Sequence, residues 1–307
     1  MSFQPVYTRR IILFCFILVF GFSVKAQKEV VDSLKVLLGN AKHDTTRCTI
    51  LYQMIESEND DSLWPLYNQQ LLEIAERGIK NNKGDLKRFY QSTYAGALNN
   101  FGYMYDRLGD IEKSFKYYNQ SLKIQDEIND KSGRAFTFIN VGFLYRQQGN
   151  VAKALESYHS ALKIFISINE KLGIATAYNN IGFILDNQGE YMEALNYYQK
   201  ALKMYEELGD LDGQAISYNN IGFIYKKYKD PTCIGNDCKR KDLIKAIECM
   251  NKSIKIREQM GDKVGLAAGL NVLGGIYDSF GDPFCTSDSI TCRKEGEDKA
   301  LSFYLQS

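Results

Sequence analysis

The stretch "YNNIGFILDNQGEYMEALNYYQKAL", residues 178–202, decides the fold. Its apolar residues recur at spacings of three and four, which place them on one face of an α-helix. Gly189 then interrupts the pattern beside Glu190, and a second stretch with the same periodicity follows. The segment therefore predicts two helices joined by a tight turn. One such hairpin cannot bury its apolar face alone, so we expect further hairpins to stack against it.

Copies of this hairpin occur along most of the chain. The first four equivalent glycines lie 40 residues apart (142 − 102, 182 − 142 and 222 − 182), and the fifth lies 52 further on (274 − 222). These glycines are Gly102, Gly142, Gly182, Gly222 and Gly274. A glycine inside a helix costs about 1 kcal/mol relative to alanine, so five at one register need a packing reason. We expect each to let its helix approach the second helix closely, where Ala154 or Ala194 faces it.

The pattern resembles the tetratricopeptide repeat, which places large, Leu-Gly, Tyr, Ala and Phe positions at fixed spacings over 34 residues. The copies here match all of that pattern except the final proline, and six further residues lengthen the second helix and the turn. The resemblance implies an all-α fold, a right-handed solenoid of helix hairpins. The copies fall at 94–133, 134–173, 174–213, 214–265 and 266–307, of which the last two carry insertions and the last is truncated.

Three further parts of the sequence predict structure at the ends of the array and between its copies. Residues 28–93 are less regular and predict a degenerate N-terminal helical cap, in which Pro65 stands in the first turn of a helix. Trp64 is expected to pack in this cap, and stacking on a ligand is the alternative. "NDKSG" (129–133) and its equivalents predict the turns between copies. "KALSFYLQS", at the end, opens a second helix and then stops, so we expect the sequence to be a fragment of a longer protein.

The N-terminus reads as a secretory signal peptide over residues 1–26. Arg9 and Arg10 precede the apolar run "IILFCFILVFGFSV", and Val24-Lys25-Ala26 then offers a small residue for cleavage after Ala26. An uncleaved N-terminal anchor is the alternative. We therefore expect the protein to be exported, to the periplasm in a bacterium.

Paired cysteines mark the two insertions. "DPTC" opens one and "DPFC" the other, and a second cysteine follows in each, so the pairs are Cys233 with Cys238 and Cys285 with Cys292. In an exported protein each pair predicts a local disulfide. Free thiols, or a four-cysteine zinc site across the two loops, are the alternatives. Cys48 and Cys249 lie in apolar helical segments and are expected in the core.

The sequence offers no catalytic pattern. The net charge of +1 does not favour nucleic-acid binding, and a hydrophobic content of 45% does not favour disorder. His43 and His159 are far apart, and no triad, phosphate loop or metal-binding spacing accompanies them. We expect a non-enzymatic chain that needs no cofactor and no metal.

A stripe of asparagines and aromatics on the first helix of each copy is the candidate binding surface. Its members are Asn99, Asn100, Tyr103, Asn140, Phe143, Arg146, Asn179, Asn180, Phe183, Asn219, Asn220, Phe223 and Lys226. Asparagine is a poor helix former, so its recurrence needs an explanation. One is structural, a hydrogen bond to the neighbouring copy. The other is functional, a clamp on a ligand's backbone, as the resemblance implies for this position.

The resemblance implies a protein-binding solenoid with a protein or peptide partner, no nucleic acid, and a membrane only through the signal peptide or a missing segment. The lysine and arginine companions of a carboxylate clamp are mostly absent, which favours an extended or helical ligand. The whole arrangement is similar to the exported sensor regions of Bacteroidetes-type signalling proteins. A stand-alone periplasmic scaffold or assembly factor is the alternative.

Overall fold

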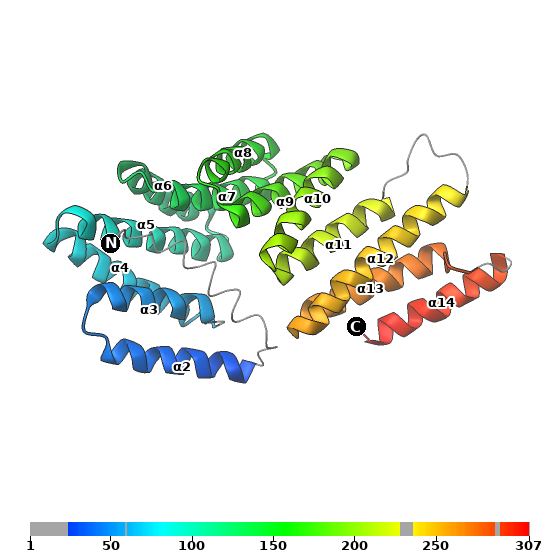
Figure 1. Cartoon of the computed structure of the whole chain (residues 1–307), viewed down its shortest axis with the longest axis horizontal. Helices are drawn as coiled ribbons and strands as arrows, with labels where there is room; N and C mark the ends of the chain where they lie inside the picture. The colour runs from blue at the N-terminus through cyan, green and yellow to red at the C-terminus, as the bar shows by residue number, and fades with distance from the viewer. Residues whose placement is uncertain (1–23, 59, 228–235, 286–288, 307) are drawn as a thin grey trace. The chain divides into compact units, whose positions relative to one another are not determined.

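A computed structural model describes residues 24–58, 60–227, 236–285 and 289–306. Over these ranges the chain is helical and contains no strand (Figure 1). The helices are α2 (Val24–Asn40), α3 (Asp44–Ser57), α4 (Trp64–Asn81), α5 (Gly84–Arg107), α6 (Ile111–Glu127), α7 (Lys131–Gln147), α8 (Val151–Ser167), α9 (Lys171–Gln188), α10 (Tyr191–Leu208), α11 (Leu211–Lys227), α12 (Asn236–Met260), α13 (Lys263–Phe280) and α14 (Ser289–Gln306). The predicted signal peptide lies almost entirely outside the described residues.

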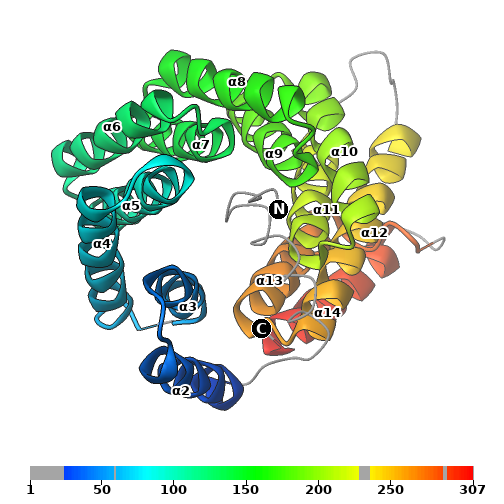
Figure 2. The same cartoon turned by 60° about the vertical axis from the view of Figure 1, so that its left-hand side comes forward.

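The helices form two compact units, 24–177 and 178–306, which divide within α9. In the first unit α5 packs against α6 and α7 against α8. In the second, α11 packs against α12 and α13 against α14, and Figure 2 shows these neighbours side by side. The predicted all-α solenoid class is confirmed. None of the described helices combines the length and the apolar character needed to cross a membrane.

Left-handed residues end the helices at equivalent places. Gly109, Gly149, Gly189 and Gly281 follow the first helix of their hairpins with φ between 71° and 85°. The predicted end of the first helix at Gly189 is confirmed. After the second helices the same role falls to Asn129 (φ 52°), Asn169 (53°), Gly209 (68°) and Gly261 (69°). Glycine and asparagine are the residues that adopt this conformation most readily.

The turns between copies are shorter than predicted. α7 begins at Lys131, inside the stretch 129–133, because the Asp130 carboxylate accepts a hydrogen bond from the Gly133 amide at 2.9 Å. Asp262 caps α13 in the same way through the Gly265 amide, also at 2.9 Å. A side-chain cap of this kind satisfies one of the amides that a helix start leaves without a partner.

The repeated glycine faces a side chain of the second helix, which is a tyrosine ring at four positions and Met250 at Gly222. A Cβ on Gly102 would lie 2.5 Å from the Tyr118 ring, and one on Gly142 would lie 2.6 Å from the Tyr158 ring. At Gly182 the nearest atoms are the Tyr198 ring at 3.0 Å and the Ala194 carbonyl oxygen at 3.3 Å. The expected close approach is confirmed, but the tyrosine four residues after the alanine position fills most of the space.

The N-terminal helices form their own core. Leu51, Met54 and Leu71 are at most 1% exposed, and Cys48 is fully buried among them, as expected. Trp64 is buried at the start of α4 and Pro65 stands in its first turn, also as expected. α5 begins at Gly84, so the boundary predicted between 93 and 94 falls inside a helix. Cys249 is only partly buried.

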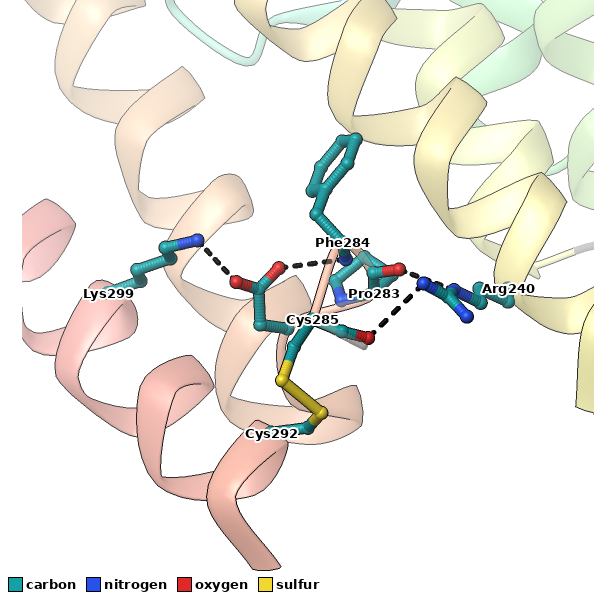
Figure 3. Close-up of a disulfide and its surroundings, with 7 residues drawn as sticks. Arg240, Pro283, Phe284, Cys285, Cys292 and Lys299 are labelled. Atoms are coloured by element: carbon teal, nitrogen blue, oxygen red, sulfur yellow. Dashed lines mark hydrogen bonds and ion pairs between the residues drawn. A yellow bond between two sulfur atoms is a disulfide. The ribbon is translucent and has the colours of Figure 1, made fainter. Parts of the chain in front are cut away.

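The second insertion forms a cross-linked corner between α13 and α14. Cys285 and Cys292 are joined by a disulfide (Figure 3). Arg240, on α12, donates to the carbonyl oxygens of Pro283 at 2.6 Å and Cys285 at 3.2 Å. The hairpin that contains α12 thus binds the main-chain carbonyl groups of this corner. Cys233 lies outside the described residues and the side chain of Cys238 is not described, so that pair stays a prediction.

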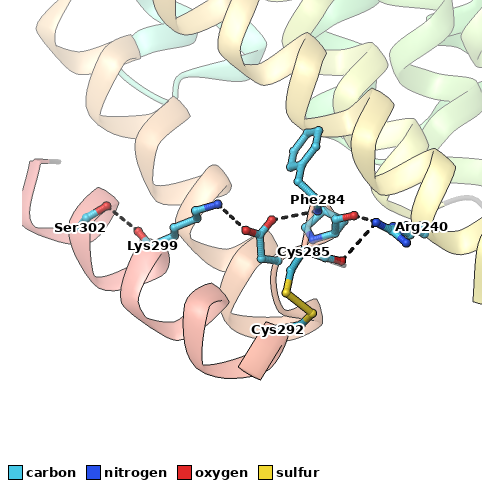
Figure 4. A network of polar contacts seen from close by, with 8 residues as sticks. Arg240, Phe284, Cys285, Cys292, Lys299 and Ser302 are labelled. Carbon is cyan, nitrogen blue, oxygen red and sulfur yellow. Dashed lines mark hydrogen bonds and ion pairs between the residues drawn. A yellow bond between two sulfur atoms is a disulfide. The ribbon is translucent and has the colours of Figure 1, made fainter. Parts of the chain in front are cut away.

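A buried carboxylate organises the same corner. Asp282 is 6% exposed, accepts a hydrogen bond from the Phe284 amide at 2.9 Å and forms an ion pair with Lys299 of α14. Figure 4 shows this chain of contacts running from Lys299 to Arg240. A buried charge is tolerated when it is paired and hydrogen-bonded, and here it ties the start of the insertion to α14.

Candidate functional site

Polar side chains join neighbouring copies at a constant offset of 41 residues. Asn140 donates to the side-chain oxygen of Asn99 at 3.2 Å, and Asn220 donates to that of Asn179 at 3.0 Å. In these pairs the structural explanation of the stripe is observed. A primary amide carries two N–H donors and an oxygen with two lone pairs, so one such bond leaves capacity for a ligand. The two explanations are therefore compatible.

Two carboxylates that follow the stripe, three residues after Tyr103 and Phe183, have partners at the same offset. Gln147 donates to Asp106 at 2.9 Å, and the Lys227 ammonium lies 3.1 Å from the Asp186 carboxylate. Burial raises the pKa of Asp106, although the Gln147 hydrogen bond opposes this. Arg146 instead stacks on its own helix, with its guanidinium carbon 4.5 Å from the Phe143 ring centroid.

In the first unit four predicted site residues line one pocket. The pocket has a volume of about 290 Å³. The predicted residues are Asn99, Asn100, Tyr103 and Asn140. Sequence reasoning missed the rest of the lining, namely Ile55, Glu58, Asp61 and Arg107, and favoured packing over ligand stacking for Trp64. The connection between α3 and α4 supplies the acidic residues, and it lies outside the repeat register.

A second amide pair holds Asn100, one of the lining residues of this pocket. Asn68, which is fully buried on α4, donates to the carbonyl oxygen of Ala97 at 3.0 Å and accepts from Asn100 at 2.9 Å. Burying an amide is costly unless its hydrogen bonds are made. These two bonds set the position of the Asn100 side chain, which is therefore preorganised in the pocket.

The pocket wall carries charge and aromatic rings. Arg107 forms an ion pair with Asp61 at 2.8 Å, and the Asp61 carboxylate also accepts from the Trp64 indole at 3.3 Å. The Trp64 and Tyr103 ring centroids lie 6.4 Å apart at an interplanar angle of 43°. A hydrogen bond to Tyr103, followed by the charges of Tyr103 and Asp61, raises the pKa of Arg107, which stays cationic.

The second unit arranges its stripe differently. Phe183 packs against the core around Tyr198, and Phe223 packs against the core around Ile247. Both rings are half-buried, whereas Tyr103 and Phe143 are 45% and 37% exposed. In the second unit the two predicted aromatic positions thus take part in helix packing. Asn180, Asn219 and Lys226 are half-buried on the same helices.

Among the described residues no group of histidine, cysteine or acidic side chains could hold a metal ion. What the site offers is hydrogen bonding, charge and aromatic surface, which are the elements of recognition.

Comparison with known proteins identifies the repeats. The tetratricopeptide repeat family model matches residues 93–167 and 173–232. Among curated proteins none matches the chain. Solved structures resemble it at low sequence identity, which supports the fold alone.

Three of these structures illustrate the likeness. NprR in complex with its cognate peptide NprX is 17% identical with a TM-score of 0.57, over 98% of this chain and 80% of that one. A Rap protein complexed with competence and sporulation factor is 16% identical with a TM-score of 0.56, over 97% and 88%.

The third is a signal transduction ATPase from Pyrococcus horikoshii with a tetratricopeptide repeat sensor. It is 17% identical with a TM-score of 0.60, over 91% of this chain but only 40% of that one. Family match and hairpin geometry agree, and residues 93–167 and 173–232 of the chain are tetratricopeptide repeats.

Proposed function

We propose that the chain is a non-catalytic module that binds a protein or peptide segment through the asparagine-bearing helices. One observation carries the proposal: the pocket in the first unit gathers Asn99, Asn100 and Asn140 beside Tyr103. Amide side chains can donate to and accept from a ligand's backbone at once, so they recognise a segment whatever its sequence. The likeness to NprR, whose structure holds a peptide, supports this class of ligand.

Export and a sensory role are the finer part of the proposal. The basic residues and apolar run before Ala26 support secretion. A peptide-binding array outside the cytoplasm suits the sensory part of a larger bacterial signalling protein. N-terminal sequencing of the protein from a periplasmic fraction tests export. A mature N-terminus at Gln27 supports it, and a cytoplasmic chain that still begins at Met1 contradicts it.

Peptide binding is tested with Asn140→Ala. Ligands are selected from a displayed library of random peptides and their affinities are measured by calorimetry. The variant removes an amide that donates to Asn99 and lines the pocket, so we expect the affinity for the selected peptides to fall at least tenfold. The lost hydrogen bond destabilises the protein by only about 0.5–1.5 kcal/mol.

Asn119→Ala, at an exposed position on α6, is the matched control and should change neither quantity. Loss of stability in Asn140→Ala with unaltered affinity would show that the asparagines act only in packing. A failure of the library to yield any ligand for the wild-type chain counts against the module itself.

A further inference from the structure

The lining of the pocket beside Trp64 contains one more carboxylate than cation. Two carboxylates, Glu58 and Asp61, and one guanidinium, Arg107, line it. We propose that the pocket receives a lysine or arginine side chain of the bound segment and that Glu58 is its charge partner. The inference rests on the proposed peptide-binding function and names the residue type that the site selects.

Glu58 is the carboxylate with room for a cation. Asp61 is already engaged by Arg107 at 2.8 Å. Over the described residues, no ammonium or guanidinium lies within 4.0 Å of the Glu58 carboxylate. Lys35 of α2 interacts electrostatically with Glu58 from a greater distance, and its ion pair, at 3.1 Å, is with Asp32. The Glu58 side chain also accepts a hydrogen bond from the Asp60 amide at 3.1 Å, which helps to hold it in place.

The walls of the pocket suit the stem and the head of a cationic side chain. Ile55 and the buried Trp64 offer apolar surface to a methylene stem. The chain itself places a cation here, because the Arg107 guanidinium carbon lies 6.0 Å from the Tyr103 ring centroid while it pairs with Asp61. Cations in this geometry are attracted by the ring face.

Size and amide placement define the rest of the ligand. A pocket of about 290 Å³ is at the lower end of the range for small-molecule sites, and so fits one long side chain with its neighbouring backbone. Asn99, Asn100 and Asn140 line the same pocket and can bind the flanking peptide groups. The expected occupant is therefore a peptide segment with a lysine or arginine at the anchoring position.

Trp64 provides the readout, because it is the single tryptophan of the chain. The full-length protein is titrated with acetyl-Gly-Lys-Gly-amide and its arginine analogue while Trp64 emission is recorded. The norleucine and glutamate analogues are the comparison peptides. We expect a saturable change with the two basic peptides and affinities at least tenfold lower for norleucine and glutamate.

Glu58→Gln keeps the shape of the side chain and removes its charge. We expect it to weaken the lysine peptide about tenfold and to reduce the effect of added salt. Glu127→Gln, an exposed carboxylate on α6, is the matched control and should leave both unchanged. Circular dichroism of each variant confirms that it is folded.

The outcomes separate the two proposals. If the norleucine peptide binds as tightly as the lysine peptide, or if Glu58→Gln binds like the wild type, the charge inference is wrong while peptide binding stands. Binding detected by calorimetry without a response from Trp64 places the cation elsewhere and also overturns it. If neither these peptides nor the random library yields a ligand, both proposals fail.

Discussion

Gly142→Ala tests the packing that defines each hairpin. An added Cβ would lie 2.6 Å from Cε1 and 2.7 Å from Cδ1 of Tyr158, whose side chain is fully buried. Carbon atoms pack at about 3.5–4.0 Å, so the ring or the helix must move by about 1 Å. Overpacking of this kind destabilises by about 1–3 kcal/mol. Alanine's better helix propensity offsets about 1 kcal/mol, which leaves a net destabilisation of about 0–2 kcal/mol.

Two matched substitutions give the expected order. At Gly182 the nearest ring atom would be 3.0 Å away, so Gly182→Ala should be less harmful than Gly142→Ala. At Gly39, on α2, nothing lies within 4 Å, so Gly39→Ala reports propensity alone and should be neutral or slightly stabilising. The stability ranking should therefore be Gly142→Ala below Gly182→Ala below Gly39→Ala.

The assay is urea unfolding followed by far-ultraviolet circular dichroism. Midpoints should be compared rather than extrapolated free energies, because repeat arrays can depart from two-state unfolding. Adding Tyr158→Leu to Gly142→Ala should relieve the clash, with a coupling of at least about 0.5 kcal/mol in a double-mutant cycle. Equal midpoints for Gly142→Ala and Gly39→Ala, or no coupling, would refute the reasoning.

Two further predictions concern the second unit. Arg240→Met keeps the aliphatic stem but loses the charge-assisted hydrogen bonds to the carbonyl oxygens of Pro283 and Cys285. We expect each lost bond to lower the free energy of unfolding of this unit by no more than about 1.5–3 kcal/mol, which is measured as a lower urea midpoint. An unchanged midpoint would show that these bonds do not stabilise the corner. The pKa of Asp212 is raised mainly by burial, and the nearby charges of Asp210 and Asp262 raise it further, whereas the charge of Arg257 lowers it. A raised folded-state pKa gives stability that is present below the unfolded pKa of about 3.9 and is lost as pH rises through the folded value. Asp212→Asn should therefore be more stable than the wild type at pH 7, with the gap closing toward about pH 4; a gap independent of pH would exclude the charge as its cause.

The repeat pattern was sufficient to predict the fold, because each hairpin is determined by residues close together in the sequence. The glycine register, the turn glycines and Pro65 each act within one hairpin, so a single stretch such as 178–202 contains the information. The residue that packs against Gly142 was harder to predict from the sequence. The sequence suggested Ala154, but Tyr158 stands one helical turn further on and its ring reaches back over the glycine.

The lining of the candidate pocket could be predicted only in part. Asn99 and Asn140 could be named because they recur, and their offset of 41, one more than the repeat period, could have revealed the pairing. Glu58 and Asp61 belong to a connection without repeat register. Their place beside Arg107 depends on how α3 and α4 pack against α5, which no local pattern encodes.

The corner at Cys285 has a consequence for how the insertion can vary. Arg240 contacts carbonyl oxygens, which every type of residue supplies, so the joint between α12 and the corner does not depend on side chains in the loop. Asp282 likewise caps a main-chain amide. The side chain at position 283 could therefore change during evolution without loss of the contact that joins α12 to this corner.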